Sequence, residues 1–393
     1  MTSLDSSPIG TTVTITGHDH RFGTDYEVQA FMPDRLPEDI ALSSTTWTKI
    51  GDAMAELGRL DSAAALLPNP QLVIRVVTRL EAVGTAALEG TYANLAELFA
   101  AEVEPTQGEI PPRVREVLNF LDAVEIGYQW ITSAPITRTL LSKLQATLIR
   151  GTDSDGPSAG RVRTDQVFIG PKHRPITEAR FVPPPPGDQL EAMYDEWLLW
   201  VRDDQNPPSL QLLVRVALAH YQFETIHPYH DGNGRVGRLA IGLQLVREKA
   251  LSQPVLSVSP WLKEHEDEYK DHLLNLSLTG DWDPWVGFMA EAIAVEARRT
   301  QGRIERLLSL QEELSGRARE AFPRGRLAVD IADSLIGFPV ITVAWAEKRF
   351  GKTNQASRNA IHQLVDSEIL EPYDEARYDK RYWNPQVFQV IAR

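Results

Sequence analysis

Hydrophobic positions recur every three to four residues over most of the chain, and this spacing predicts a protein built mainly from helices. The pattern begins near Ser43 and Ser44, which are suitable N-cap residues. Residues 1–45 are polar and irregular, with short strands expected in "TTVTIT" and "DYEVQAFMP". We expect helices over residues 46–62, 70–93, 111–131, 135–149, 187–203, 208–225, 235–248, 260–277 and 284–320.

The helical pattern is interrupted between residues 151 and 187. Here "DQVFIG" and "ARFV" are typical of two short strands, and the Gly and Pro residues between them indicate a β-hairpin. Four consecutive prolines, Pro183 to Pro186, follow the hairpin. Because proline fixes φ, we expect a rigid strut here, and we disfavour a ligand segment for an SH3-like groove.

The pattern changes again after residue 324. "ITVAWAEKRFG" and "NQASRNAIHQLVDSEIL" predict a helix-turn-helix, "YDEARYDKRYWNP" resembles the wing of a winged helix, and "RYWNPQVFQVIAR" is strand-like. The polar residues expected to face a groove are Lys352, Asn354, Arg358 and Asn359. However, residues 325–393 hold nine basic and nine acidic residues, whereas DNA-binding domains are usually basic. DNA binding is therefore disfavoured, and docking of a protein or dimer formation is favoured.

Composition limits the class of protein. The chain has 393 residues, of which 42% are hydrophobic, so two or three domains are expected. No stretch of 18 apolar residues and no signal-like N-terminus are present, and we expect a soluble cytoplasmic protein without a membrane partner. The absence of cysteine excludes disulfides, thiolate metal sites and cysteine nucleophiles. A net charge of −14 disfavours nucleic acids as partners.

The segment "TIHPYHDGNGRVGRL" precedes a helical pattern and is rich in glycine. Glycine lets a backbone approach an anion closely, and a helix N-terminus offers unpaired N–H groups, so this segment predicts a phosphate site. It lacks the "GK[ST]" ending of a Walker loop, and a helix rather than a strand precedes it, which disfavours a dinucleotide fingerprint. An ordinary turn is also disfavoured, as is a zinc site at "HPYHD", since no third ligand stands at useful spacing.

The charged residues of this segment suggest its chemistry. Arg235 and Arg238 lie three positions apart on one helix face and suit a polyphosphate. Asp231 could hold the Mg²⁺ that a triphosphate brings, and Asn233 could donate to a phosphate oxygen. A neutral His227 could take a proton from a hydroxyl. Together these residues predict phosphoryl or nucleotidyl transfer to an alcohol.

The segment resembles the motif of the Fic family, HPFx(D/E)GNGRxxR. "HPYHDGNGRVGR" matches it at every fixed position except Tyr229, which replaces a phenylalanine that normally packs inward. "RTDQVFIG" and "ARFVPPPP" resemble the β-hairpin flap of the family and its proline run, and "GDWDPWVGFM" resembles a downstream helix start. Residues from about 30 to 320 thus look like a Fic core with an N-terminal helical extension.

The resemblance implies a mainly α fold: a Fic helical core with a small β-hairpin flap, plus the C-terminal winged helix-turn-helix. The expected division is 1–110 for the extension with an inhibitory helix, 111–320 for the catalytic core and 325–393 for the C-terminal module.

Fic proteins typically transfer AMP from ATP to a Ser, Thr or Tyr hydroxyl of a target protein. The resemblance implies that His227 is the general base and Asp231 the Mg²⁺ ligand. It also implies that Gly232, Asn233 and Gly234 form an anion hole and that Arg235 and Arg238 bind the outer phosphates. Val167, Phe168 and Ile169 would form a target-docking flap that adds the target as a strand. Tyr269 would contact the adenine. Relatives often carry paired tyrosines at the last site, whereas Lys270 takes the second place here.

A second motif lies upstream, in "TAALEGTYANL". Thr85, Glu89 and Gly90 match the inhibitory motif of the family, [ST]xxxE[GN]. The resemblance implies that Glu89, within a predicted helix, pairs with Arg238 and leaves ATP misaligned. A solvated helix residue is the less favoured interpretation of Glu89.

Two alternatives to an AMP-transferring enzyme stay open. One is a nucleotide-sensing regulator whose winged helix binds DNA. The other is a Fic enzyme that uses another nucleotide donor or removes AMP. The intact His227 and the complete GNGRxxR favour AMP transfer. The long predicted helix over 284–320 would also allow a homodimer, although a core helix explains it equally well.

Overall fold

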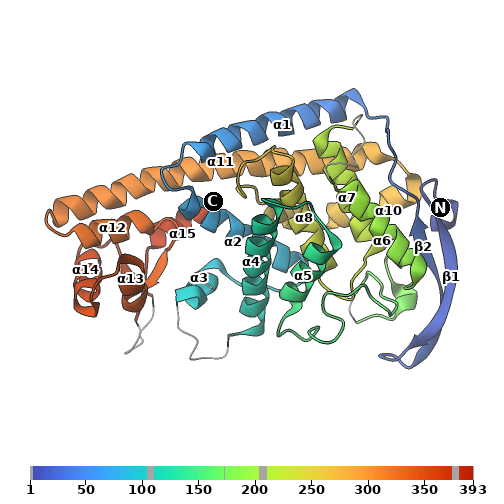
Figure 1. Ribbon diagram of the computed structural model, residues 1–393, viewed down its shortest axis with the longest axis horizontal. Helices are drawn as coiled ribbons and strands as arrows, with labels where there is room; N and C mark the ends of the chain where they lie inside the picture. Colours follow the sequence, from blue (N-terminus) through green and yellow to red (C-terminus); the bar gives the residue numbers. More distant parts are fainter. Residues whose placement is uncertain (1–2, 104–109, 172, 203–209, 374–379, 393) are drawn as a thin grey trace.

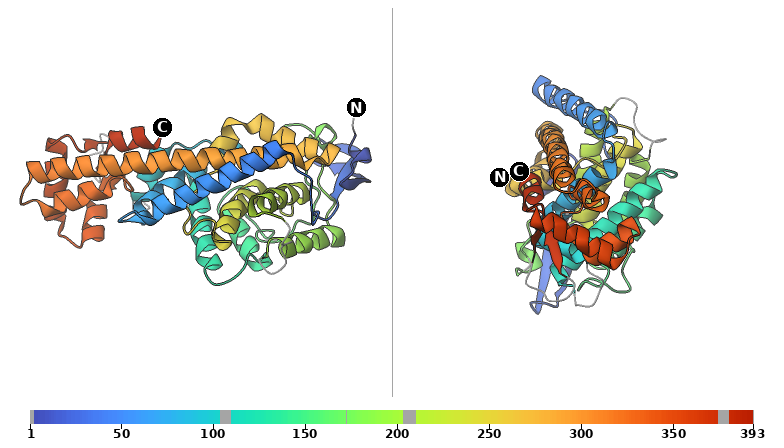
Figure 2. Two further views of the ribbon diagram at one scale, coloured as in Figure 1. Left: turned by 90° about the horizontal axis from the view of Figure 1, so that it is seen from above. Right: turned by 90° about the vertical axis from the view of Figure 1, so that its left-hand side faces the viewer.

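The computed structural model describes residues 3–103, 110–171, 173–202, 210–373 and 380–392. Its longest helix, α11 (Trp282–Ala321), extends through much of the molecule, and α1 (Ser44–Ala65) lies along it (Figures 1 and 2). A hairpin of β1 (Gly10–Asp19) and β2 (Thr24–Pro33) lies at one end, and the C-terminal elements lie at the other. Between them pack α2 (Pro70–Leu88), α3 (Leu95–Val103), α4 (Pro112–Ile131), α5 (Arg138–Ile149), α6 (Asp188–Trp200), α7 (Leu212–Ile226), α8 (Asn233–Arg247), α9 (Ser259–Glu264) and α10 (Glu266–Thr279).

The mainly helical prediction is confirmed, although α3 was not predicted, and two of the predicted helices differ for clear local reasons. The helix predicted over 70–93 ends at Leu88, because Gly90 adopts a left-handed φ of 86° and turns the chain. The helix predicted over 260–277 is two helices, α9 and α10, which meet at His265 with a non-helical φ of −114°. No described helix is both long and apolar enough to cross a bilayer.

The strand predictions are partly correct. β1 and β2 form the expected strands, each ten residues long, in an antiparallel register that pairs Gly10 with Pro33. The predicted flap hairpin is reduced to one bridge, between Ile169 and Phe181. The strand predicted for the C-terminus is wrong beyond β5 (Arg381–Trp383), because Asn384 caps a short helix, α15 (Pro385–Ile391), that begins with proline.

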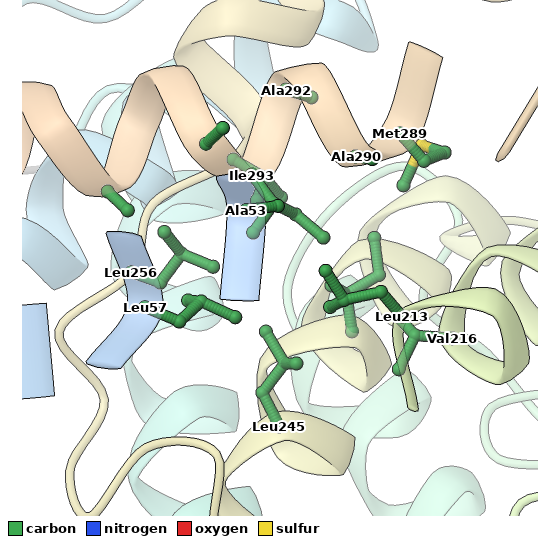
Figure 3. Packing of buried hydrophobic residues seen from close by; sticks show 14 of the residues in the cluster. Ala53, Leu57, Leu213, Val216, Leu245, Leu256, Met289, Ala290, Ala292 and Ile293 are labelled. Carbon is green, nitrogen blue, oxygen red and sulfur yellow. The ribbon is translucent and has the colours of Figure 1, made fainter. Parts of the chain in front are cut away.

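A hydrophobic core encloses α7 and α8. Side chains from α1, α7, α8 and α11 meet in it, as Figure 3 shows for Ala53, Leu57, Leu213, Val216, Leu245 and Ile293. Nearly every residue of α7 and most of α8 are buried. The short loop between these two helices is therefore anchored on both sides by close-packed elements.

The C-terminal module forms around its own sheet. It contains α12 (Arg326–Ser334), β3 (Val340–Thr342), α13 (Val343–Phe350), α14 (Asn354–Asp366), β4 (Glu371–Pro372), β5 and α15, with the strands in the order β3-β5-β4. α13 ends at Gly351 with a φ of 61°, and the Oγ1 of Thr353 caps α14 by accepting from the Ala356 N–H at 3.3 Å. These two helices match the predicted helix-turn-helix, and Lys352, Asn354, Arg358 and Asn359 are exposed. Much of the predicted wing lies outside the described residues, and the partner of this module remains a prediction.

Helix α2 contributes buried side chains to three hydrophobic clusters. Near its start, Leu72 and Val76 are buried with Ile336 in the hydrophobic cluster of the C-terminal module. Arg75 adds a cation–π contact, with its guanidinium 4.2 Å from the ring centre of Phe338. Its other end packs against α4 and α9 in the middle of the molecule. α2 thus connects the terminal module to the centre of the fold.

The shared core gives a matched test of stability. Leu57 is 1% exposed, whereas Leu66, at the end of α1, is 84% exposed. Replacing Leu57 by alanine should lower the free energy of unfolding by about 2–5 kcal/mol, because transfer energy is lost and a cavity is left. Leu66→Ala should change it by less than about 0.5 kcal/mol. Urea unfolding followed by tryptophan fluorescence would measure both, and equal losses would contradict the packing described.

Candidate active site

A cavity of about 160 Å³ opens beside the loop between α7 and α8. Its walls come from the end of α2, the flap, the start of α8 and α10, which are far apart in sequence. Of the residues singled out from the sequence, those that line it are Glu89, Ile169, His227, Gly234, Arg238 and Tyr269. The fold therefore brings the inhibitory motif, the flap and the glycine-rich motif to one place.

His227 ends helix α7 in a left-handed conformation, with φ 47° and ψ 63°. Its backbone N–H donates to the Phe223 carbonyl at 3.0 Å, and its Nδ1 lies 3.2 Å from the Glu224 carbonyl oxygen. Because a carbonyl only accepts, Nδ1 carries the proton and Nε2 is left as the acceptor. Burial lowers the pKa of His227 to about 4. The imidazole is thus neutral and suited to receive a proton.

Arg163, which the sequence did not single out, holds the loop that carries His227. Its Nε donates to the His227 carbonyl at 2.8 Å, and its backbone N–H donates to the Pro228 carbonyl at 2.9 Å. A third bond runs from its Nη1 to the carbonyl of Asp165, at the start of the flap, at 3.2 Å. The side chain is buried, and burial lowers its pKa to about 10. No local pattern marks such a residue, since its role depends on distant carbonyl groups.

The first turn of α8 is shaped by side chains that point back into the loop. Gly232 starts it with a left-handed φ of 83°. The Oδ1 of Asn233 accepts from the Tyr229 N–H, and its Nδ2 donates to the Tyr229 carbonyl, both at 2.8 Å. One of the two Nδ2 hydrogens of Asn233 is thus used inside the loop, and donation from this side chain to a phosphate stays a prediction. An anion would also meet backbone N–H groups of the helix N-terminus.

Tyr229 packs inward as expected for the aromatic position of the motif. It is completely buried, and its hydroxyl lies 2.7 Å from that of Tyr194. Because a buried hydroxyl needs a partner, Tyr194 explains why tyrosine is accepted where the family has phenylalanine.

Arg235 and Asp231 form a pair beside the cavity. Nη2 of Arg235 lies 3.4 Å from Oδ1 of Asp231, and Nη1 lies 3.3 Å from Oε2 of Glu116. Arg235 is 4% exposed and is not among the residues that line the cavity. The structure thus places Arg235 as a support for Asp231, not as an open ligand for outer phosphates.

The side chains around the motif loop fit a magnesium ion only in part. No cluster of three or more metal-binding side chains occurs in the described parts of the chain. Mg²⁺ is commonly held by one or two carboxylates together with the phosphates of a substrate. The single carboxylate of Asp231 fits a site of this kind, in which the ion arrives with a nucleotide.

The inhibitory motif contacts the second motif arginine directly. Nη2 of Arg238 donates to Oε1 of Glu89 at 2.5 Å, and Nε donates to Oγ1 of Thr85 at 2.7 Å. Burial would raise the pKa of Glu89, but the charge of Arg238 outweighs it and the pKa is lowered. Burial would lower the pKa of Arg238, but the negative charge of Glu89 outweighs this effect and raises the pKa above its ordinary value. Both groups are therefore charged, and Arg238 is occupied.

Glu81, also missed from the sequence, fixes the helix that carries the inhibitory motif. It is buried and accepts hydrogen bonds from the Ser259 N–H at 2.9 Å and from Oγ of Ser257 at 3.1 Å. One turn later, Gly84 lies so close to Pro260 that a Cβ would be 2.8 Å from the proline nitrogen. These contacts hold α2 against the segment that leads into α9. In sequence, Glu81 is not distinguishable from an ordinary polar helix position.

The inner wall of the cavity has two further titratable groups. Glu224 is 9% exposed, its Oε1 has no hydrogen-bond partner among the described residues, and burial raises its pKa to about 7. The hydroxyl of Tyr269 lies 2.8 Å from Nε2 of His220. Lys270, in the place of a second tyrosine, pairs with Glu266. Glu224 was not predicted, because a carboxylate next to the motif has no distinctive spacing.

The three flap residues have different surroundings. Ile169 lines the cavity, and it exchanges two backbone hydrogen bonds with Phe181, at 2.8 and 3.0 Å. Phe168 points to the N-terminal hairpin, where the guanidinium of Arg21 lies 4.9 Å from its ring centre. Val167 and Phe168 border a separate groove, outside the cavity. The flap thus has one side toward the cavity and another toward the hairpin.

Comparison with known proteins agrees with this geometry. The model described as "Fic/DOC family N-terminal" matches residues 47–129, and the model described as "Fic/DOC family" matches residues 135–245. The chain is 31% identical over 157 residues to "Protein adenylyltransferase fic-1" of Caenorhabditis elegans, covering 39% of this chain and 27% of that protein. It is 34% identical over 139 residues to "Protein adenylyltransferase Fic" of Drosophila virilis, covering 35% and 24%. The matches thus span about a quarter of the length of these relatives.

Solved structures share the fold. A Fic family protein from Desulfovibrio desulfuricans G20 superposes with a TM-score of 0.56 at 20% identity, covering 88% of this chain and 97% of that one. Fic-1 from C. elegans gives a TM-score of 0.50 at 20% identity, covering 66% and 74%. The two matched models, the shared fold and the convergence of their motif residues on one cavity lead to one assignment: the chain belongs to the Fic/DOC family.

Proposed function

We propose that this chain is a protein adenylyltransferase that transfers AMP from ATP to a Ser, Thr or Tyr hydroxyl of a target protein, and that Glu89 inhibits it. The main observation in support of this proposal is that a neutral His227 and the guanidinium of Arg238 line the same cavity. The relatives from C. elegans and D. virilis that match the central part of the chain are named protein adenylyltransferases. This shared name supports the same chemistry here.

The geometry suits attack by a hydroxyl group. Nε2 of His227 accepts the hydroxyl proton while the hydroxyl oxygen forms a bond to the α-phosphorus of ATP. The bond between the α-phosphorus and the bridging oxygen breaks, and pyrophosphate leaves with the electron pair. The product is a phosphodiester between AMP and the target side chain. His227 is held for this task by the Glu224 carbonyl at Nδ1 and by Arg163 at its own carbonyl.

Charge neutralisation completes the site. Backbone N–H groups at the start of α8, around Gly234, would face the negative phosphates, aided by the positive end of the helix dipole. Asp231, steadied by Arg235, would hold Mg²⁺, which when bound neutralises phosphate charge. Arg238 would bind the outer phosphates once Glu89 has moved away. Tyr269 and the apolar side chains of Ile169 and Phe181 would border the adenosine.

The inhibitory role of Glu89 follows from competition for Arg238. A buried guanidinium needs a counter-charge, and in this structure Glu89 provides it. A triphosphate that reached Arg238 would have to displace this carboxylate. With Glu89 in place, the outer phosphates would be excluded from Arg238, and the α-phosphate would not be aligned with the attacking hydroxyl.

Removing the inhibitory carboxylate should increase activity. Glu89→Gly should raise AMP transfer by roughly ten- to a hundredfold, which corresponds to a typical coupling of about 1–3 kcal/mol between two sites. Glu89→Gln should give a smaller increase, because it removes the charge and keeps most of the side chain. Intact mass after incubation with ATP and Mg²⁺ would measure self-modification. Glu291→Gln, which breaks the exposed pair with Lys49, is the matched control, and no gain for either Glu89 variant would refute inhibition by this residue.

Removing the base should separate binding from chemistry. Because residue 227 has a positive φ, asparagine is the suitable replacement, since it tolerates this conformation better than alanine. In the Glu89→Gly background, His227→Asn should lower the transfer rate by about 10²–10⁴-fold, the usual contribution of a general base. The dissociation constant for ATP, measured by calorimetry, should change less than about threefold. Substantial remaining transfer would exclude His227 as the base.

The pH dependence should report the lowered pKa of His227. Burial disfavours the charged imidazolium, so the base stays neutral until the pH falls towards about 4. Because the negative charge of Glu89 raises the pKa of His227, removing Glu89 lowers this pKa further. The transfer rate of the Glu89→Gly variant at saturating ATP should therefore be level from pH 8 to pH 5, with circular dichroism as the control for folding. A decline with a midpoint near 6.5, typical of an exposed histidine, would contradict this environment.

A further inference from the structure

A groove of about 570 Å³ lies between α2 and α4, which are neighbours in the middle of the molecule (Figure 1). It is also lined by Pro254, by Glu102 of α3 and by Phe338 of the C-terminal module. This volume is typical of a site for a small molecule. Of the described residues, none lines both this groove and the active-site cavity. The groove is therefore a separate candidate site.

The wall formed by α2 carries more positive charge than its counter-ion balances. Arg75 and Arg79 share a single carboxylate: Nη2 of Arg75 lies 2.7 Å from Oε2 of Glu102, and Nε of Arg79 lies 3.1 Å from the same oxygen. Nε of Arg75 is buried and has no hydrogen-bond partner among the described residues. A buried donor without a partner costs free energy. An anionic group bound at this wall would supply both the missing acceptor and the missing charge.

The aromatic ring of Phe338 brings a third arginine close to this wall. The guanidinium of Arg75 lies 4.2 Å from the ring centre and that of Arg349, in α13, lies 4.4 Å from it. Burial lowers the pKa of Arg75 to about 10, and the charges of Arg79 and Arg349 add to this effect. Arg75 is still charged near neutral pH, and an anion beside it would relieve the repulsion among these three side chains.

The wall formed by α4 has the opposite charge and an apolar middle. Its apolar surface comes from Leu118, Leu121 and Val124. Asp122 is neutralised by Arg150, whose Nη2 lies 2.5 Å from its Oδ2. Glu125, in contrast, is exposed and makes no ion pair or hydrogen bond in the described parts of the chain. This wall therefore offers one unpaired carboxylate next to apolar side chains.

The groove continues towards the rear of the inhibitory contact. Thr78 and Tyr128 line both the groove and a much smaller cavity of about 20 Å³. That smaller cavity is also lined by Glu81 and Arg238. Arg238 thus borders the active-site cavity and the smaller cavity alike. A molecule in the groove would lie against the same helix, α2, that presents Glu89 to Arg238.

The charges of the two walls select the class of ligand. A simple anion would suit Arg75 and be repelled by Glu125, and a simple cation would meet the reverse situation. A zwitterion with an apolar body suits both walls. An α-amino acid with a large apolar side chain has these features: its carboxylate would bind the guanidinium of Arg75, its ammonium group would face Glu125, and its side chain would pack on the apolar part of α4.

We propose that the groove between α2 and α4 binds an α-amino acid with a large apolar side chain, and that the bound amino acid strengthens the inhibition by Glu89. The groove is present in the arrangement in which Glu89 pairs with Arg238, and a ligand stabilises the arrangement that it binds. The regulatory part rests on the proposed inhibition by Glu89, whereas the binding site itself is independent of the proposed AMP transfer.

Calorimetry with free amino acids tests the site in the full chain. The probes are L-leucine, L-methionine, L-phenylalanine and L-tryptophan, and at least one should bind with a Kd of about 1 mM or lower, as expected for ligands of this size. The amide of the best binder, which lacks the carboxylate, should bind at least about tenfold more weakly. Its deaminated analogue, which lacks the ammonium group, should bind at least about threefold more weakly. Absence of binding by all four amino acids overturns the site.

Two substitutions locate the binding. Arg75→Gln should weaken the best binder at least about tenfold, because a charged hydrogen bond is lost. Glu125→Gln should weaken it at least about threefold, because an exposed charge pair is lost. Arg35→Gln, which breaks an exposed pair with Glu196, is the matched control and should leave the Kd unchanged. Circular dichroism checks that the Arg75 variant folds, and an unchanged Kd in the exposed Glu125→Gln variant overturns the assignment on its own.

The affinity for ATP tests the regulatory part. In the unsubstituted chain, the saturating amino acid should raise the Kd for ATP by about fivefold or more, because it opposes the displacement of Glu89. In the Glu89→Gly variant no carboxylate has to be displaced, and the amino acid should change this Kd by less than about twofold. An unchanged or lowered Kd in the unsubstituted chain, or an equal rise in both chains, overturns the regulatory part. Failure of Glu89→Gly to transfer AMP would count against the proposed function and not against the amino-acid site.

Discussion

The structure depends on the need of a buried arginine for a counter-charge. Arg238 is 4% exposed on a helix that is packed on almost every side, so its guanidinium cannot be left to water. Thr85 satisfies Nε, and Glu89 supplies the negative charge. In the proposed reaction the outer phosphates of ATP would take over that charge. The same requirement therefore explains both the pairing of Arg238 with Glu89 and the way in which a nucleotide would compete with it.

The remaining parts of the site serve to hold a short loop still. Helices α7 and α8 fix its two ends, and Asn233 and Arg163 bond to its carbonyl groups from inside and outside. The left-handed conformation of His227 then leaves one imidazole nitrogen open to the cavity. Such preorganisation matters because a catalytic base displaced by about 1 Å loses much of its rate advantage. In the proposed reaction, the tight packing around the loop would thus contribute to the chemistry as well as to stability.

Sequence motifs pointed to residues that the fold brings to one cavity, and they left out residues that belong to no motif. The glycine-rich segment and its resemblance to the Fic motif pointed to His227 and Arg238, and the resemblance of the upstream segment pointed to Glu89. Arg163, Glu81 and Glu224 act through contacts with residues more than sixty positions away or through burial, and no spacing reveals this. Helix ends were shifted for a similar reason: Gly90 was included in a periodic segment although its φ of 86° stops the helix. The bonds of the Asn233 side chain inside the loop were not predicted, because its partner, the Tyr229 backbone, is visible only in three dimensions.

Helix α2 links the folding of the chain's last segment to the state of the cavity. Its first turns complete the hydrophobic interior of the C-terminal module, and its last turn presents Thr85 and Glu89 to Arg238. A rigid-body displacement of α2 at Leu72 would therefore also move Thr85 and Glu89. If release of Glu89 by a nucleotide displaced α2, thermodynamic reciprocity would make a loosened module favour that nucleotide by the same free energy.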